Sequence, residues 1–253
     1  MAKTKKAPKI FIYGKHAVEE ALLHAPHTLR KILLSSDMQD RKLRELIKRS
    51  GLPVEPLNER QATSQAEGNA PHQGIIALVS LGAMTTPFEK FLDSFTPTPD
   101  TSVLFLGGVQ DPHNVGNIIR SAAAFGAGAV LVPTHNQSPI TGAVIKASAG
   151  MAFRVPLITV DNPQQALAAL KKKGMRVHGL AGEAGKSIDG EPFAEPAIFV
   201  LGNESEGISG SARALCDQML SIPLHSRAES LNVATAAAVA LYAWSRRHQV
   251  SLK

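Results

Sequence analysis

The chain has 253 residues, of which 44% are hydrophobic and 19% charged, enough for one large domain or two smaller ones. Its apolar runs are too short to span a membrane and its first residues are polar and basic, so we expect a cytoplasmic protein without membrane contact. The single cysteine, Cys216, excludes an internal disulfide and a cysteine-cluster zinc site, and its place before an apolar strand favours packing over nucleophilic chemistry.

The net charge of +6 is concentrated in the first third of the chain. Residues 1–80 hold 13 Lys and Arg against 8 Asp and Glu, whereas the remaining 173 residues hold 14 against 13. This surplus is compatible with a solvated surface that carries a basic N-terminal tail, and equally with a surface that binds a polyanion such as RNA.

The first third of the chain alternates helical and extended patterns. The hydrophobic spacing predicts a helix over 15–24, a strand over 29–34, a basic amphipathic helix over 38–49 and a strand over 74–81. These elements indicate a small α/β domain over residues 1–81.

Residues 82–102 contain three prolines and one short predicted helix, 88–95. This composition is typical of a linker. Such a linker would leave the small domain free to swing.

From residue 103 onward, strand-like runs alternate strictly with helical ones. The strands are predicted over 103–106, 129–132, 155–160, 175–180, 197–201 and 219–224. The clearest helices are predicted over 163–173 and 233–248. This alternation indicates an α/β fold, with a mostly parallel sheet covered on both faces, over residues 103–253. The apolar last helix either packs within one subunit or forms a dimer interface.

Several familiar motifs are absent. No G-x-G-x-x-G follows the first strand of the larger domain, and residues 179–187 imitate a phosphate-binding P-loop with the wrong spacing between glycines. The sequence has no G-x-S-x-G nucleophile elbow and no spacing of His, Asp and Glu that indicates a metal site.

Three polar, glycine-containing segments remain, and each follows a predicted strand: 111–126, 201–207 and 222–234. Ligands of open α/β sheets bind at the carboxyl ends of strands, which makes these segments candidates for a site. Taken singly, they have simpler interpretations. Asn114, Ser230 and Asn232 can cap helices, and Arg120 can be a surface residue.

Together, the segments resemble the three motifs of the SPOUT methyltransferase superfamily in its TrmH branch. The pattern N-x-G-x-x-x-R is followed by L-G-x-E-x-x-G, and then by I-P with S-L-N-V further on. The resemblance covers residues 103–248, and Ala234 departs from it where many relatives have Ser. Residues 13–19 and 72–74 also resemble the small substrate-binding domain of the RlmB-like 23S rRNA members.

The resemblance implies a C-terminal trefoil knot preceded by a small α/β/α substrate-binding domain. It implies that S-adenosylmethionine binds in the knot at Gly202, Ile222 and Leu231, as methyl donor to a ribose 2′-hydroxyl of RNA without a metal. The catalytic residues that it implies are Arg120, Asn114, Glu204, Ser230 and Asn232.

The resemblance also implies roles for these residues, and their chemistry favours some roles over others. Arg120 is protonated at ordinary pH, so stabilising an alkoxide or positioning a phosphate suits it better than acting as a base. Ser230, Asn114 and Asn232 would orient the phosphate, the ribose and the loops. Glu204 would fix the loop that carries Gly202 or pair with Arg120.

The resemblance further implies a homodimer with composite active sites that acts on 23S rRNA or a ribosome precursor. Three alternatives stay open from the sequence. The first is the same reaction on transfer RNA, and the second is a resistance-type enzyme that modifies another ribosomal nucleotide. The third is a non-catalytic RNA-binding assembly factor with this fold.

Overall fold

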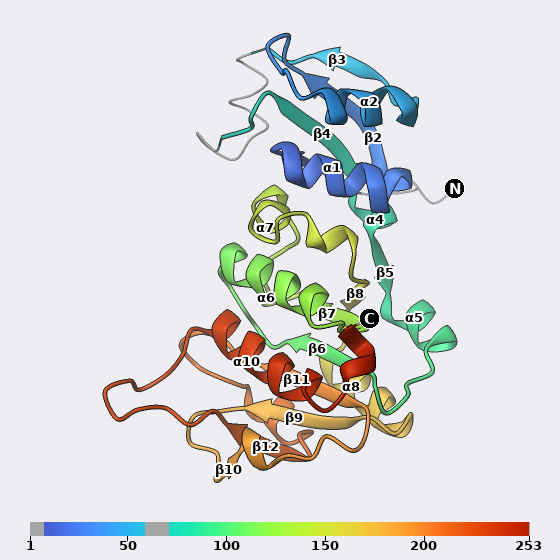
Figure 1. Ribbon diagram of the computed structural model, residues 1–253. Helices are drawn as coiled ribbons and strands as arrows, with labels where there is room; N and C mark the ends of the chain where they lie inside the picture. The colour runs from blue at the N-terminus through green and yellow to red at the C-terminus, as the bar shows by residue number, and fades with distance from the viewer. Residues whose placement is uncertain (1–7, 59–70, 253) are drawn as a thin grey trace.

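The computed structural model describes residues 8–58 and 71–252, which form two sheets of different size (Figure 1). The smaller sheet has four strands in the order β1-β4-β2-β3. Its strands are β1 (Lys9–Tyr13), β2 (Leu29–Leu34), β3 (Val54–Pro56) and β4 (Ile75–Ser80). Strand β4 is antiparallel to β1 and β2, whereas β3 is parallel to β2. Residues 1–7 of the expected basic tail lie outside the described part.

Two helices pack on one face of this sheet: α1 (Lys15–His24) and α2 (Arg41–Ser50). A short 3-10 turn, η1 (Pro26–Thr28), follows α1. Helix α2 begins later than the predicted 38–49 because Asp40 caps it, accepting a hydrogen bond of 3.1 Å from the Leu43 N–H. The expected small domain of helices packed on a sheet is therefore confirmed over residues 8–58 and 71–80.

The predicted linker, 82–102, is built into the larger domain. It includes most of α4 (Leu81–Met84), and all of β5 (Thr85–Pro87) and α5 (Phe88–Ser94). Strand β5 pairs in parallel with β8 at the edge of the larger sheet. The sequence did not reveal this strand because Pro87 and two threonines are typical of a turn.

The larger sheet has eight strands in the order β10-β12-β9-β11-β6-β7-β8-β5, and every pairing is parallel. The remaining strands are β6 (Ser102–Leu106), β7 (Ala129–Pro133), β8 (Leu157–Val160), β9 (Arg176–Leu180), β10 (Lys186–Ser187), β11 (Ala197–Leu201) and β12 (Gln218–Ser221). The predicted parallel α/β sheet is therefore confirmed. The threading of a knot stays a prediction.

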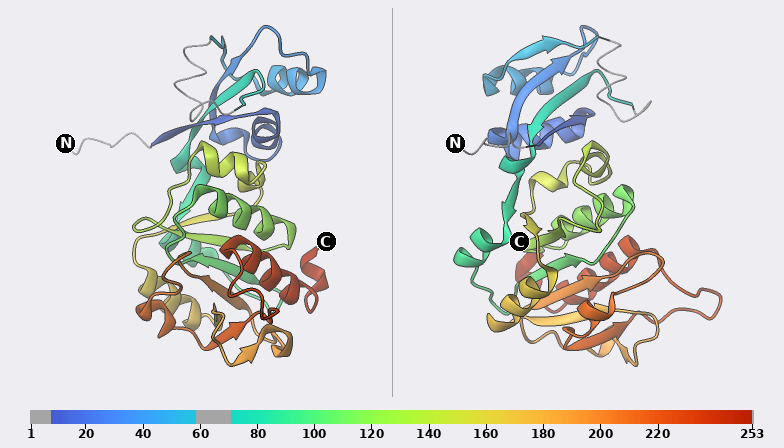
Figure 2. Two further views of the ribbon diagram at one scale, coloured as in Figure 1. Left: turned by 90° about the vertical axis from the view of Figure 1, so that its left-hand side faces the viewer. Right: turned by 180° about the vertical axis from the view of Figure 1, so that it is seen from behind.

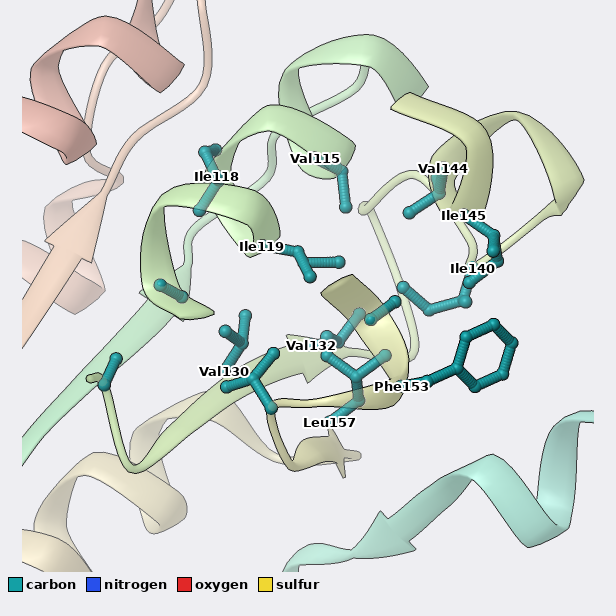
Figure 3. Packing of buried hydrophobic residues seen from close by; sticks show 14 of the residues in the cluster. Val115, Ile118, Ile119, Val130, Val132, Ile140, Val144, Ile145, Phe153 and Leu157 are labelled. Carbon is teal, nitrogen blue, oxygen red and sulfur yellow. The ribbon is translucent and has the colours of Figure 1, made fainter. Parts of the chain in front are cut away.

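Helices cover both faces of the larger sheet. They are α6 (Pro112–Ala124), α7 (Gly142–Ala147), α8 (Pro163–Lys172), α9 (Gly210–Arg213) and α10 (Val233–Ser245), with the 3-10 turns η2 (Met151–Phe153), η3 (Ile188–Gly190) and η4 (Gln249–Leu252). Helices α6, α7 and α10 pack on the face that presents Leu104 and Leu106. Figure 3 shows Ile119 of α6 and Val144 of α7 beside Val132 of β7 on this face. Helices α5, α8 and α9 pack on the face that presents Val103 and Phe105. None of the described helices is long and apolar enough to cross a membrane.

The small domain lies against one end of the larger domain, beside α7 and η2 (Figure 2). The Arg154 guanidinium lies 3.4 Å from the Glu20 carboxylate of α1, and the Lys146 ammonium lies 5.0 Å from the centre of the Tyr13 ring. These contacts join the two domains directly. In this arrangement the small domain is docked, which differs from the free swing expected of a linker.

Candidate active site

Three loops meet where strands β6, β11 and β12 end. They are loop 107–111, loop 202–207 and the segment 222–232, which extends from the body of the domain before α10 begins (Figures 1 and 2). The carboxyl ends of parallel strands lie at the same edge of a sheet, so residues about 120 positions apart become neighbours.

Loop 202–207 is a tight turn. The Asn203 and Gly207 backbones exchange hydrogen bonds of 2.9 and 3.0 Å, and the Asn203 Oδ1 accepts from the N–H groups of Ser205 and Glu206. A Cβ on Gly202 would collide with the Gly207 carbonyl carbon and the Ile208 nitrogen. Only glycine lets the two sides of this turn approach so closely.

The Glu204 carboxylate joins loop 202–207 to loop 107–111. Its Oε1 accepts hydrogen bonds from Asn114 Nδ2 at 3.0 Å and the Asp111 N–H at 3.2 Å, and its Oε2 accepts from the Gln110 N–H at 3.2 Å. Partial burial raises the pKa of this carboxyl, but these donors outweigh it and hold the pKa below its ordinary value. Glu204 is therefore an ionised tether between the loops.

Asn114 continues this network into the third segment. Its side chain is buried, and its Oδ1 accepts a hydrogen bond of 2.8 Å from Asn232 Nδ2. Asn232 in turn caps α10, as its Oδ1 accepts from the Ala234 and Thr235 N–H groups. Asn114 does not cap its own helix, which was the simpler interpretation of this residue taken singly. Asp111 caps α6, and Asn114 lies within the first turn with its side chain free to bridge the loops.

A pocket of about 580 Å³ opens beside this network. All three residues that the sequence assigned to the cofactor, Gly202, Ile222 and Leu231, line it. Glu204, Ser230 and Asn232 are also part of its wall. The pocket thus combines apolar side chains, glycine backbone and a few polar groups, as small-molecule sites do.

Arg120 lies apart from this cluster. It is exposed on α6, about 9 Å along the helix axis from Asn114, and is not among the residues that line the pocket. Within the described part of the chain its guanidinium makes no ion pair, so the expected pairing with Glu204 is absent. One chain therefore brings together Asn114, Glu204, Ser230 and Asn232, but not Arg120.

The sequence analysis missed Gln137, which holds loop 107–111 in place. Its Oε1 accepts hydrogen bonds from the Gly108 and Val109 N–H groups at 3.2 and 2.9 Å, and its Nε2 donates to the Val109 carbonyl at 2.7 Å. The side-chain amide of Gln137 thus makes the kind of hydrogen bonds with the loop backbone that a neighbouring strand would make. A glutamine in an irregular loop after a strand carries no local pattern that predicts this role.

Sequence profiles match both parts of the chain. The profile of the SpoU rRNA methylase family matches residues 101–242, and that of the RNA 2′-O ribose methyltransferase substrate-binding domain matches residues 11–82. The chain belongs to the SpoU rRNA methylase family. The three loops of the site all fall within the methylase match.

Curated relatives in this family are similar over nearly their whole length. The 23S rRNA (guanosine-2′-O-)-methyltransferase RlmB of Pseudomonas putida is 35% identical, over 94% of this chain and 97% of the relative. The RlmB protein of Haemophilus influenzae is 36% identical, over 91% and 95%. Both domains of this SpoU chain are thus present in these relatives.

Solved structures agree with the fold. The SpoU methyltransferase AviRb from Streptomyces viridochromogenes, solved with the cofactor AdoMet, has a TM-score of 0.80 at 25% identity and covers 96% of this chain and 91% of its own. The A. aeolicus TrmH/SpoU tRNA modifying enzyme has a TM-score of 0.53 at 25% identity, and its match covers 64% of this chain and 85% of its own.

Proposed function

We propose that this protein transfers a methyl group from S-adenosylmethionine to the ribose 2′-hydroxyl of a guanosine in 23S ribosomal RNA. The observation that carries the proposal is the network of Glu204, Asn114 and Asn232 beside a pocket of fitting chemistry. The names of the curated relatives supply the guanosine and the 23S RNA.

The pocket fits S-adenosylmethionine. Ile222 and Leu231 offer apolar surface to an adenine, and Gly202 lines the pocket from its tight turn. Its volume of about 580 Å³ lies within the usual range for small-molecule sites. When bound there, S-adenosylmethionine supplies an electrophilic methyl group.

Side chains of the protein then hold the RNA nucleotide that accepts the methyl group. Asn232 lines the pocket and is held by its hydrogen bond to the buried Asn114, so its side chain has a fixed position beside a ribose. The Ser230 hydroxyl, exposed at the pocket wall, is placed to bind a phosphate. Glu204 keeps loops 107–111 and 202–207 together and takes no proton.

Arg120 requires a second subunit. Its guanidinium is exposed and distant from the pocket of its own chain, so we place it in the active site of a homodimer, facing the pocket of the partner. There it stabilises the developing alkoxide and binds an RNA phosphate. The exposed Tyr242 on α10, next to Phe125 just after the end of α6, offers apolar surface for such an interface.

Arg120→Ala tests this assignment. The variant should lose methyl transfer while its affinity for S-adenosylmethionine, measured by titration calorimetry, stays unchanged. Mixing it with a Ser230→Ala variant should restore part of the activity, because a mixed dimer contains one site with both residues intact. Wild-type turnover by Arg120→Ala would remove this residue from the mechanism.

Transfer RNA is a less favoured substrate. The tRNA modifying enzyme of A. aeolicus is similar to only 64% of this chain, whereas the RlmB proteins match the small domain as well. That domain matches a profile for RNA substrate binding. Methylation of transfer RNA but not of ribosomal RNA would reverse this preference and leave the chemistry intact.

A further inference from the structure

A second cavity, of about 630 Å³, lies at the same edge of the sheet as the cofactor pocket but on the opposite face. It is bounded by the ends of β6 and β7 and by helices α8 and α9. The two cavities share Asn203, Glu206 and Gly207, so loop 202–207 is a common wall. None of the functions proposed above uses this second cavity.

The position of the second cavity is one where open α/β sheets bind ligands. Strand β6 lies between β7 and β11 in the sheet. Helix α6 connects β6 directly to β7, whereas the chain reaches β11 only after α8 has carried it across the sheet. The direction of winding therefore reverses at β6. Crevices form at such switch points, outside the carboxyl ends of the strands.

The lining suits a flat heteroaromatic ligand. Phe105, Leu167 and Ala212 form a buried apolar floor, and the exposed His135 imidazole offers a face for stacking. Gln164 adds an amide at the rim, held by a hydrogen bond of 3.1 Å to Ser211. Apolar surface with a few polar groups at its edge is what a nucleobase requires.

Glu206 places an unexpected negative charge in the wall of the second cavity. The neighbouring carboxylates are satisfied, Glu204 by three N–H donors and Glu183 by the Arg213 guanidinium at 2.7 Å. The carboxylate of Glu206 is exposed and accepts no hydrogen bond from the described part of the chain. A carboxylate at a site for a polyanion is unfavourable unless the ligand itself brings N–H donors to it.

Guanine is the base that brings such donors. Its Watson–Crick edge carries an imino N–H beside an exocyclic amino group, which two carboxylate oxygens can accept together. Uracil has one N–H between two carbonyls, and adenine and cytosine each have one amino group beside an unprotonated ring nitrogen. A carboxylate therefore distinguishes guanine from the other three bases.

We infer that the second cavity receives the base of the target guanosine, flipped out of its RNA, and that Glu206 accepts hydrogen bonds from its N1–H and 2-amino groups. The ribose then lies across loop 202–207, with its 2′-hydroxyl at the cofactor pocket. A glycosidic bond joins base and ribose, so adjacent cavities with one shared wall suit a single nucleotide. The inference rests on the proposed ribose methylation and names the residue that selects the base.

Inosine tests the contact, because it lacks only the 2-amino group of guanosine. A synthetic RNA spanning the nucleotide that the wild-type protein methylates would carry guanosine or inosine at that position. The wild-type protein should prefer guanosine in kcat/KM by about tenfold or more, the value of one hydrogen bond to a charged group. Glu206→Gln should bring the two rates within about twofold, whereas the surface control Glu89→Gln should keep the preference.

Filling the cavity gives an independent readout. Ser211→Trp, at the exposed rim, should raise KM for RNA at least about tenfold while the affinity for S-adenosylmethionine stays unchanged. Equal wild-type rates on guanosine and inosine, a preference retained by Glu206→Gln, or a wild-type KM in Ser211→Trp would each overturn the inference. Absence of ribose methylation by the wild-type protein would instead contradict the proposed function.

Discussion

The buried histidine of β9 should make the free energy of unfolding depend on pH. His178 lies in β9 with its side chain fully buried between the rings of Phe193 and Phe199, and neither ring nitrogen has a hydrogen-bond partner among the described residues. Burial lowers the pKa of this imidazole to about 4, and the nearby Glu191 carboxylate opposes the shift only in part.

The sign of the effect follows from the two states. An unfolded histidine titrates near pH 6.5, so between about pH 6.5 and 4 the unfolded chain binds a proton that the folded one does not. Stability should fall as the pH falls through this window. At about 1.4 kcal/mol per pKa unit, the loss from His178 alone reaches about 3 kcal/mol near pH 4.

His178→Phe removes this titration and keeps an aromatic ring in the cluster. Urea unfolding of the wild-type protein and the variant at pH 7, 6, 5 and 4 would measure the difference. At pH 7 we expect the variant to be at least as stable as the wild type, because it removes unpaired ring nitrogens from the core. Between pH 7 and pH 4 its free energy of unfolding should fall by about 3 kcal/mol less than that of the wild type, because it lacks the titrating imidazole. Parallel pH profiles for wild type and His178→Phe would refute the reasoning.

Three further substitutions test the site and its support. Gly202→Ala should lower S-adenosylmethionine affinity by tenfold or more in calorimetry, because its methyl group collides with the opposite side of the turn, whereas Gly185→Ala, where no atom lies within 4 Å of the added Cβ, should bind normally. Asn114→Leu should reduce methyl transfer at least about tenfold in a labelled-methyl assay, with a smaller change in cofactor affinity, since it breaks the bridge between the loops; unchanged turnover would contradict the role of this bridge. Gly116→Val should lower the free energy of unfolding by about 2–3 kcal/mol in urea titration, because α7 lies directly against this position of α6, and wild-type stability would contradict that packing.

Hydrophobic periodicity predicted most of the fold, because strands such as 103–106 and 197–201 are buried on both faces and read as continuous apolar runs. It missed β5, whose Thr-Thr-Pro sequence is stabilised as a strand only by the neighbouring β8. Short edge strands depend on partners far along the chain, and local patterns do not contain that information.

Of the residues that the motif pattern named, Asn114, Glu204, Ser230 and Asn232 lie together in the structure and Arg120 does not, and the pattern did not show how they interact. Taken singly, Asn114 could have been a helix cap, but it bridges Glu204 and Asn232, because Asp111 takes the capping position. Gln137 escaped notice since its role depends on which loops meet at the edge of the sheet. Spacing along a chain predicts neighbours on one element, and only the fold shows which elements converge.

The most direct measurement of the central claim is methyl transfer from labelled S-adenosylmethionine to ribosomal RNA from cells that lack this protein. Digestion to nucleosides and mass analysis would locate the label on the base or on the ribose. We predict one labelled 2′-O-methylguanosine in 23S RNA with the wild-type protein, and none with Arg120→Ala. Label on a base, or no transfer to ribosomal RNA by a protein that binds the cofactor, would contradict the account.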